Sequence, residues 1–224
     1  MSIRKYSEKL GLRYPTMNRA LELLEQRGGK YIVETGCTRM ENDWGAGNST
    51  PIFGEWAKEH GGSLVTVDNN ARHLGVAKSL TLDYADCIDY QLADSVTFLS
   101  HFGEFYEFKI DLFYADSFDF PLVELMQLYA SKPPDYEKAM KILKDIGDDE
   151  LIKRHGDMIL PPQEHCKREV IEALPHLHEN SIILMDDSAM PGGGKPRLAN
   201  LFLEQMGWYH LMSSQQELWV KEKP

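Results

Sequence analysis

The sequence predicts an α/β fold in which one mostly parallel sheet is covered by helices on both faces. Two observations support this class. Strand-like and helix-like segments alternate from about Lys30 to the C-terminus, as in doubly wound folds. Several strand-like segments, including SLVTVD (63–68) and SIILMDD (181–187), are largely continuous apolar runs. Such runs are typical of parallel strands that are buried on both faces.

The expected elements follow one another along the chain. A first helix is predicted in YPTMNRALELLEQRGG (14–29), where Thr16 has the character of an N-cap residue and two glycines end the pattern. Four strand–helix pairs come next, at 30–35 with 50–60, 63–68 with 71–80, 88–93 with 95–102, and 109–116 with 121–130. The remaining expected elements are a helix at 163–177, a strand at 181–187, a helix at 197–206 and two last strands at 208–212 and 217–222.

Length and composition indicate a soluble protein with one main domain. The chain has 224 residues, of which 42% are hydrophobic and 26% are charged. We divide it into a helical lead-in (1–29) and a main domain (30–224). The polar, poorly patterned stretch 131–162 is expected to form a lid over the substrate; the simpler alternative is a solvated insertion.

The net charge bears on the partners of the protein, and the cysteines and the N-terminus bear on its compartment. The net charge of −11 argues against binding to nucleic acid or to an anionic membrane, because both attract basic surfaces. The N-terminus has no apolar signal segment, and the three cysteines show no CxxC spacing. These features predict a cytoplasmic protein with reduced thiols.

Carboxylates end four of the predicted strands: Glu34, Asp68, Asp116 and the pair Asp186-Asp187. In a parallel sheet the carboxyl ends of the strands share one edge, where ligands bind. We therefore expect these acids to converge. Any one of them could instead cap a helix or start a turn.

The loop after Glu34 has the features of a ligand cradle. Gly36 and two later glycines allow close approach of the backbone to a bound molecule. Ser49 and Thr50 open the next helix, whose free N–H groups suit a carboxylate or a phosphate. The segment is neither a GxGxxG fingerprint nor a P-loop, so it is weak evidence by itself.

The second and third strands end in residues suited to a nucleoside. Asp68 could accept hydrogen bonds from two ribose hydroxyls, or it could serve only as a cap for the helix that begins near Asn70. Asp94 and Ser95, after the third strand, could face an adenine ring. Capping of the following helix is an equally good reading of this pair.

This order of signals resembles the class I S-adenosylmethionine (SAM)-dependent methyltransferases over nearly the whole chain from Lys30. The resemblance implies a Rossmann-like, seven-stranded, mostly parallel sheet with a reversed last strand. It also implies an acid-x-Gly loop after the first strand and a ribose-binding acid after the second. The cofactor-binding residues that it implies are Glu34, Gly36, Cys37, Thr38, Ser49, Thr50, Asp68, Asn69, Asp94, Ser95 and Asp116.

Two segments narrow the resemblance to the metal-dependent O-methyltransferases of the catechol and macrolide-sugar (TylF/CmcI-like) type. They are FYADSFDF (113–120) and LMDDSAM (184–190). In that family an aspartate after the fourth strand and an acidic pair after the fifth bind magnesium, and the matching residues are Asp116, Asp186 and Asp187. Hard oxygen ligands suit Mg²⁺. A strand-end turn is the alternative for the acidic pair.

The catalytic base is expected to differ from that of the catechol enzymes. Those enzymes carry a lysine three residues after the first metal aspartate, where this sequence has Asp119. The candidate catalytic residues are therefore Asp116, Asp119 and His165, although His165 could simply be solvated. The motif PGGGK (191–195) is either a gating loop, with Lys195 reaching an anionic acceptor, or a flexible turn.

The leading hypothesis is a SAM-dependent O-methyltransferase that acts with Mg²⁺ on a hydroxyl of a small polyhydroxylated acceptor, such as a sugar or a sugar-containing metabolite. An NAD-type oxidoreductase is the first alternative, and it is disfavoured because the glycine fingerprint is absent. A non-catalytic ligand-binding α/β domain is the second. Neither nucleic acid nor membrane is expected as a partner, and a homo-oligomer is left open.

Overall fold

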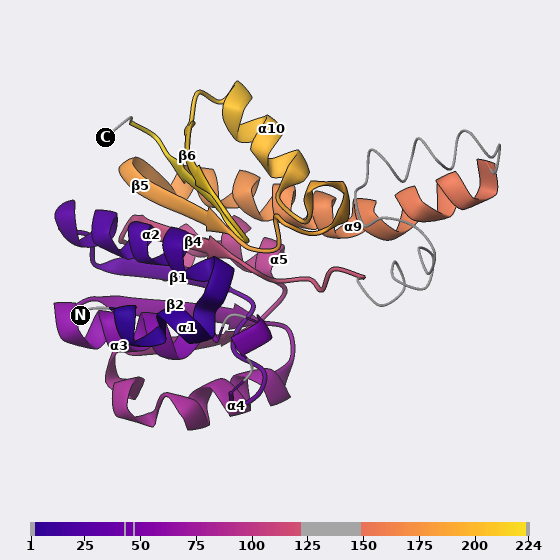
Figure 1. The fold of residues 1–224 in the computed structure, drawn as a ribbon. Coiled ribbons are helices and arrows are strands. Elements are labelled where there is room, and N and C mark those ends of the chain that lie inside the picture. The colour runs from indigo at the N-terminus through magenta and orange to yellow at the C-terminus, as the bar shows by residue number, and fades with distance from the viewer. Residues whose placement is uncertain (1–2, 43, 47, 122–148, 223–224) are drawn as a thin grey trace.

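The computed structural model describes residues 3–42, 44–46, 48–121 and 149–222. Its centre is a seven-stranded sheet with the order β3-β2-β1-β4-β5-β7-β6 (Figure 1). Neighbouring strands among β1 to β5 are parallel, whereas β7 is antiparallel to both β5 and β6. The predicted α/β class, with its reversed last strand, is confirmed. The strands are β1 (Tyr31–Thr35), β2 (Ser63–Asp68), β3 (Ile88–Leu92), β4 (Ile110–Ala115), β5 (Leu177–Met185), β6 (Tyr209–Ser213) and β7 (Glu217–Val220).

Helices connect these strands and cover the sheet on both faces. They are α1 (Ser7–Leu10), α2 (Tyr14–Gln26), α3 (Ser49–His60), α4 (Ala71–Leu80), α5 (Ser95–Ser100), α6 (Phe102–Phe105), α9 (Asp149–Ala173) and α10 (Arg197–Gln205). The predicted helix at 121–130 lies almost wholly outside the described residues, as does 131–148 of the expected lid. The rest of that lid, 149–162, is the first part of α9. None of the described helices has the length and apolar character needed to cross a membrane.

The start of α2 differs from the prediction. The helix begins at Tyr14 with a proline in its first turn, because the fixed φ of proline suits that position. Thr16 is therefore not the N-cap. Its hydroxyl lies 3.1 Å from the carbonyl oxygen of Arg13 and 2.8 Å from Oε1 of Gln216, so Thr16 links the N-terminal helix to the segment that leads into β7.

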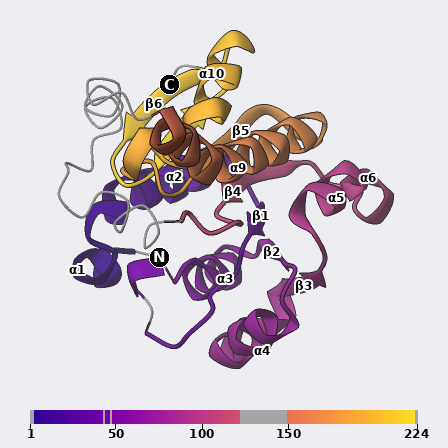
Figure 2. The ribbon, with the colours of Figure 1, turned by 90° about the vertical axis from the view of Figure 1, so that its right-hand side faces the viewer.

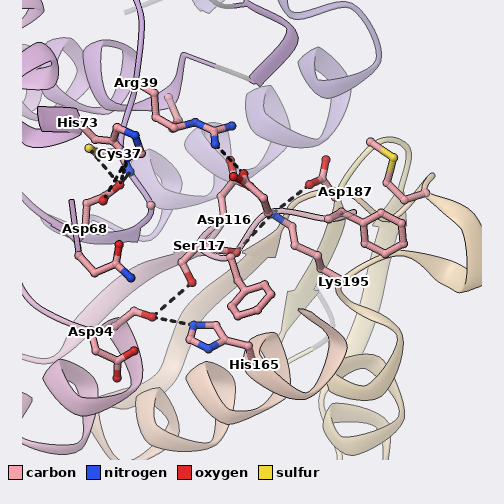
Figure 3. A pocket seen from close by; sticks show the side chains of 18 of the residues that line it. Cys37, Arg39, Asp68, His73, Asp94, Asp116, Ser117, His165, Asp187 and Lys195 are labelled. Atoms are coloured by element: carbon pink, nitrogen blue, oxygen red, sulfur yellow. Dashed lines mark hydrogen bonds and ion pairs between the residues drawn. The ribbon is translucent and has the colours of Figure 1, made fainter. Parts of the chain in front are cut away.

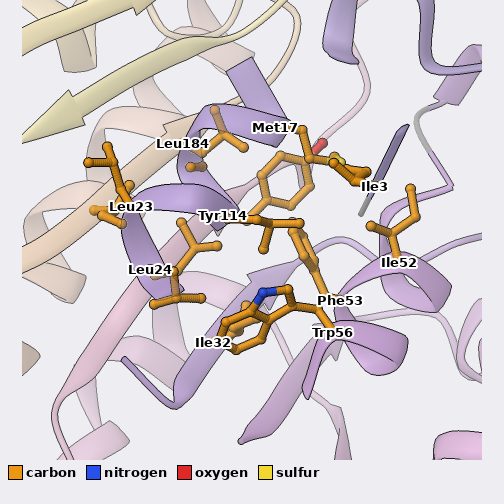
Figure 4. Packing of buried hydrophobic residues seen from close by; sticks show 14 of the residues in the cluster. Ile3, Met17, Leu23, Leu24, Ile32, Ile52, Phe53, Trp56, Tyr114 and Leu184 are labelled. Carbon is orange, nitrogen blue, oxygen red and sulfur yellow. The ribbon is translucent and has the colours of Figure 1, made fainter. Parts of the chain in front are cut away.

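Strand side chains alternate between two hydrophobic clusters, one on each face of the sheet. Ile32 and Leu64 point toward α2 and α3, whereas Val33 and Val65 point toward α5, α9 and α10, as the two-residue period of a strand requires. Figures 2 and 4 show these two layers and the packing of the first cluster, respectively. Ile3 is buried in that first cluster, so the N-terminal lead-in shares a core with the sheet.

A buried carboxylate ties α3 to the sheet. Glu34, in β1, is fully buried and accepts hydrogen bonds from the hydroxyls of Thr50 and Thr66, both at 2.7 Å, and from Ser49. Burial raises the pKa of Glu34 to about 7, although the three hydroxyls act in the opposite direction. Glu34 therefore fixes the start of α3 at the carboxyl edge of the sheet.

Replacing Glu34 with glutamine should change how stability depends on pH. Between about pH 5 and 7 the folded protein retains a proton on Glu34 that the unfolded chain has lost, so wild-type stability falls as pH rises through this range. The variant Glu34→Gln lacks this contribution, which is on the order of 3 kcal/mol. Urea denaturation at both pH values measures it. The control Glu104→Gln, at an exposed position, should parallel the wild type, and a Glu34→Gln curve that also parallels it would contradict this account.

Candidate active site

A cavity of about 590 Å³ lies at the carboxyl edge of the sheet (Figure 3). Each of the five parallel strands contributes a residue just beyond or at its end: Gly36 after β1, Asp68 on β2, Asp94 after β3, Asp116 after β4 and Asp187 after β5. The convergence that the sequence predicted therefore exists in the structure, and it follows from the parallel topology.

Most of the predicted site residues line this cavity. They are Gly36, Cys37, Ser49, Asp68, Asn69, Asp94, Ser95, Asp116, Asp119, His165 and Asp187. Glu34, Thr38, Thr50 and Asp186 do not line it; all are buried. Glu34 was expected to contact the ligand, but its side chain points toward α3 because β1 alternates its side chains between the two faces.

The loop after β1 approaches the loop after β4 closely. Gly36 has a φ of +78°, and a Cβ at this position would lie 2.5 Å from the carbonyl oxygen of Asp116, so glycine is required here. In the same loop, Thr38 Oγ1 and Asn48 Oδ1 are buried and lack a hydrogen-bond partner among the described residues. Buried polar atoms are normally paired, although neither of these two residues lines the cavity.

Asp68 is oriented toward the cavity rather than used as a helix cap. Its carboxylate accepts hydrogen bonds from the backbone N–H of Cys37 at 3.2 Å and of Asn70 at 2.8 Å. The cap of α4 is Asn70, whose Oδ1 accepts from the N–H of Arg72 at 2.9 Å. The capping alternative for Asp68 is therefore wrong, and the backbone hydrogen bonds hold its carboxylate at the cavity wall.

For Asp94 the capping reading is confirmed, and the contact with an adenine ring stays a prediction. The residue lines the cavity and caps α5, accepting from the N–H of Thr97 at 2.9 Å. Burial acts to raise its pKa, but the hydrogen bonds from Thr97 outweigh this and lower it.

His165, on α9, belongs to a polar cluster on the Ser95 side of the cavity. Its Nε2 lies 3.0 Å from Ser95 Oγ, and Ser95 Oγ lies 3.3 Å from Ser117 Oγ. Ser117 in turn donates to the buried carboxylate of Glu169 at 2.5 Å. His165 is thus a paired side chain rather than a solvated one.

Asp119 lies at the rim. Its side chain is 78% exposed, and its Oδ1 is 2.6 Å from Nη1 of Arg39. Asp119 is therefore a solvent-exposed carboxylate that is already paired with an arginine.

The acids after β4 and β5 are joined to two cationic side chains. Lys195 Nζ lies 2.7 Å from Asp116 Oδ1 and 3.0 Å from Asp187 Oδ2. Arg13 Nε donates to both oxygens of Asp186, at 2.9 and 2.8 Å, and Arg13 Nη2 lies 3.3 Å from Asp187 Oδ1. Tyr114 Oη lies between Asp116 and Asp186, at 3.3 and 3.2 Å. Three carboxylates, two cations and a phenol thus form a closed ring, which we call the charged ring.

Burial sets the protonation tendencies within the charged ring. Burial raises the pKa of Asp116 well above its usual range, and the Lys195 ammonium only partly offsets this. For Lys195 itself burial lowers the pKa, but Asp116 and Asp187 outweigh this effect and raise it. Lys195 is therefore a permanent cation.

The charged ring does not fit the predicted magnesium ion. The three carboxylates proposed as ligands already bind Lys195 and Arg13, whereas Mg²⁺ requires oxygen atoms around it in near-octahedral geometry. Among the described residues no group of three or more histidine, cysteine or acidic side chains is arranged to bind a metal ion. The magnesium site therefore stays a prediction that the side-chain arrangement does not support.

Sequence reasoning missed the most distant member of the site. Arg13 lies in the N-terminal lead-in and is 173 residues from Asp186, and no local pattern identifies it. Lys195 was considered only as a partner for an anionic acceptor or as part of a turn. Other lining residues that were not anticipated are Arg39, His73, Ser117, Phe118, Phe120 and Met190.

Structural comparison identifies the fold. The sequence matches no protein-family model and no curated protein. The O-methyltransferase TomG from Streptomyces achromogenes, involved in tomaymycin synthesis and solved with SAM, is 11% identical, with a TM-score of 0.56 over 97% of this chain and 84% of that one. The Podospora anserina methyltransferase PaMTH1, bound to S-adenosylhomocysteine (SAH), is 13% identical, with a TM-score of 0.55 over 97% and 81%.

A third solved structure agrees with these two. An O-methyltransferase from Bacillus cereus, solved with SAH, is 12% identical, with a TM-score of 0.50 over 90% of this chain and 77% of that one. At these identities the likeness concerns the fold alone. The chain therefore has the Rossmann-like fold of the SAM-dependent methyltransferases, as the sequence predicted.

The residues present fit a nucleoside cofactor of this kind. The cavity offers a carboxylate at the end of β2 and a glycine where the backbone closes on the site. Asp68 would accept the hydrogen bonds of the ribose hydroxyls.

A side chain at position 36 should destabilise the protein. The variant Gly36→Ala combines a positive φ with a backbone clash against Asp116, and it should lower the free energy of unfolding by about 3 kcal/mol. Gly75→Ala is the matched control, because Gly75 lies within α4 with no atom in the path of a Cβ. The control should be stabilised by about 0.5–1 kcal/mol. Equal stability of both variants in urea denaturation would contradict the close approach of the two loops.

Proposed function

We propose that this protein is a SAM-dependent O-methyltransferase that acts on a hydroxyl group of a small polyhydroxylated acceptor. The observation that supports this most strongly is the position of Asp68: in a methyltransferase fold, its backbone-anchored carboxylate lines the cavity at the end of β2. Its place in the fold is the one from which an acid binds the ribose of a nucleoside cofactor.

Different parts of the cavity wall would bind the parts of the cofactor. Asp68 would accept hydrogen bonds from the ribose hydroxyls, and Ser95 would border the adenine. Gly36 would allow the methionine part to approach the backbone. When bound, SAM supplies a methyl group on a positively charged sulfur.

The chain's contribution to transfer is to orient the acceptor and to take up its proton. Transfer of that methyl group to a hydroxyl oxygen would require the hydroxyl proton to leave the acceptor. Of the three predicted candidates, Asp116 is the carboxylate that lies at the cavity wall with only 16% of its side chain exposed, so we assign it the proton. Positioning contributes most of the remaining effect.

The lining favours a hydroxyl-rich acceptor over a flat apolar one. Three aspartates, at positions 116, 119 and 187, face the cavity beside Ser117, and each can accept hydrogen bonds from hydroxyl donors. A sugar or a sugar-containing metabolite meets this description. Magnesium assistance, which the sequence suggested, is left out of the proposal because Lys195 and Arg13 already bind the carboxylates concerned.

The NAD-type alternative is not favoured. The sheet with its antiparallel β7 belongs to a fold that matches solved methyltransferases, and the charged ring has no part in hydride transfer. A non-catalytic binding domain would be consistent with cofactor binding alone and is distinguished by methyl transfer.

Calorimetric titration tests the cofactor directly. SAH should bind the wild type saturably, with a dissociation constant in the micromolar range, and NAD⁺ should give no heat of binding. Asp68→Asn should weaken SAH binding by roughly 100-fold, because the ribose hydroxyls lose a charged acceptor.

The control for that variant is Asp83→Asn, at an exposed position in the turn before β3, which should bind SAH like the wild type. Binding of NAD⁺ in place of SAH would reject the methyltransferase proposal. Equal SAH affinity in Asp68→Asn would reject the assigned role of Asp68.

A further inference from the structure

The charged ring contains a cation that is built into the fold. Lys195 is 3% exposed, and its ammonium bridges Asp116 and Asp187, the acids that follow β4 and β5 (Figure 3). Buried lysines are rare unless they are paired, and this one is paired twice. It also lines the cavity, so the bridge forms part of the surface that a substrate meets.

Contacts of the glycines that precede Lys195 hold its backbone next to the charged ring. Gln163, buried on α9, donates from Nε2 to the carbonyl oxygens of Gly192 and Gly194, both at 3.1 Å. Gly194 has a φ of +61°, and a Cβ there would overlap the carbonyl oxygen of Asp187. The PGGGK motif is thus a tightly packed support for Lys195, not a flexible turn.

The same contacts argue against an anionic partner for Lys195. Two of the three ammonium hydrogens are directed at carboxylates, and the third faces the carbonyl oxygen of Ser117 at 3.4 Å. No strong donor is left for a carboxylate or phosphate of the acceptor. The available lone pairs belong to Asp116 and Asp187, and these accept hydrogen bonds from neutral hydroxyls.

Charge balance gives an independent argument about divalent metals. The ring holds three aspartates against Lys195 and Arg13, which leaves one net negative charge when all are ionised. A magnesium ion in addition would leave one net positive charge in a buried site. It would also place a dication beside an ammonium, a repulsion that a low-dielectric site strengthens. Displacing the ammonium would leave it buried without a partner, which is equally unfavourable.

We propose that Lys195 replaces the divalent cation at this site, so that Asp116 and Asp187 orient a neutral polyol acceptor without any metal ion. The orientation of the acceptor by Asp116 and Asp187 rests on the proposed function, whereas the replacement of the metal ion by Lys195 does not. The chain lacks a lysine three residues after Asp116, yet the fold supplies an ammonium to that same carboxylate from position 195. The acid cluster therefore keeps a positive charge at its centre.

Metal titration of the wild type and of a lysine variant tests this inference. Wild-type protein should show no heat of Mg²⁺ or Mn²⁺ binding and no change in melting temperature with either ion. Lys195→Met removes the ammonium and keeps much of the side-chain volume. It should bind Mn²⁺ saturably under conditions in which the wild type gives no heat of binding, since three carboxylates then face only one cation.

The matched control is Lys58→Met. Lys58 also pairs with a carboxylate, that of Asp86, but on the exposed surface away from the cavity, so its replacement should leave metal binding at the wild-type level. Saturable binding of Mg²⁺ to the wild type that is lost in Asp187→Asn would overturn the proposal, and so would a folded Lys195→Met variant with no gain in Mn²⁺ affinity. If Lys195→Met does not fold, the wild-type titration still tests the proposal, because saturable Mg²⁺ binding at this site would overturn it.

These readouts do not depend on methyl transfer. A protein that binds neither SAM nor SAH would refute the proposed function and leave the metal result interpretable. A protein that binds SAH and also requires Mg²⁺ would keep the proposed function and refute the replacement by Lys195.

Discussion

The burial of acids at the carboxyl edge of the sheet is the constraint on which the rest of this structure depends. Parallel strands bring Asp116 and Asp186 side by side, and the carboxylate of Asp186 is buried while that of Asp116 is largely so. Uncompensated buried charges of one sign are strongly unfavourable. In this structure these charges are compensated by Arg13, from the N-terminal helices, and by Lys195, from the segment before α10. Segments from opposite ends of the chain are thus linked to the middle of the sheet.

This compensation also explains features that look unrelated in the sequence. The N-terminal helices pack into the main core and position Arg13 over Asp186. Gln163 on α9 and the glycines of PGGGK fix the backbone from which Lys195 extends. In the cavity the result is a wall that is rich in hydrogen-bond acceptors yet nearly neutral, which suits hydroxyl groups better than ions.

The predicted site residues that the structure brings to the cavity are those whose position follows from topology. Asp68, Asp94 and Asp187 follow or end parallel strands, so any correct assignment of the strands brings them to one edge. The sequence placed Glu34 at the ligand, but the side chains of a strand alternate between the two faces of the sheet. The carboxylate of Glu34 instead accepts a hydrogen bond from Thr50 at the start of α3. Alternation could have been applied to β1, but the end of the strand was not certain from sequence.

Other parts of the site depend on contacts that no local pattern encodes. Arg13 meets Asp186 across 173 residues, and the burial of Lys195 depends on a glutamine of another helix. The expected magnesium site is left without support for the same reason: the three acids are where the sequence put them, but their cationic partners come from elsewhere in the chain. A sequence motif of acidic residues does not reveal whether those residues pair with a metal ion or with a lysine or arginine from another part of the chain.

The central claim is that the cavity at the carboxyl edge binds the cofactor with its ribose on Asp68 and its sulfur facing Asp116. A crystal structure of the protein grown with SAH tests it most directly. We expect the ribose hydroxyls within hydrogen-bonding distance of the Asp68 carboxylate and the sulfur on the side of the charged ring. A nucleoside bound outside this cavity, or in it with the ribose away from Asp68, would contradict the account.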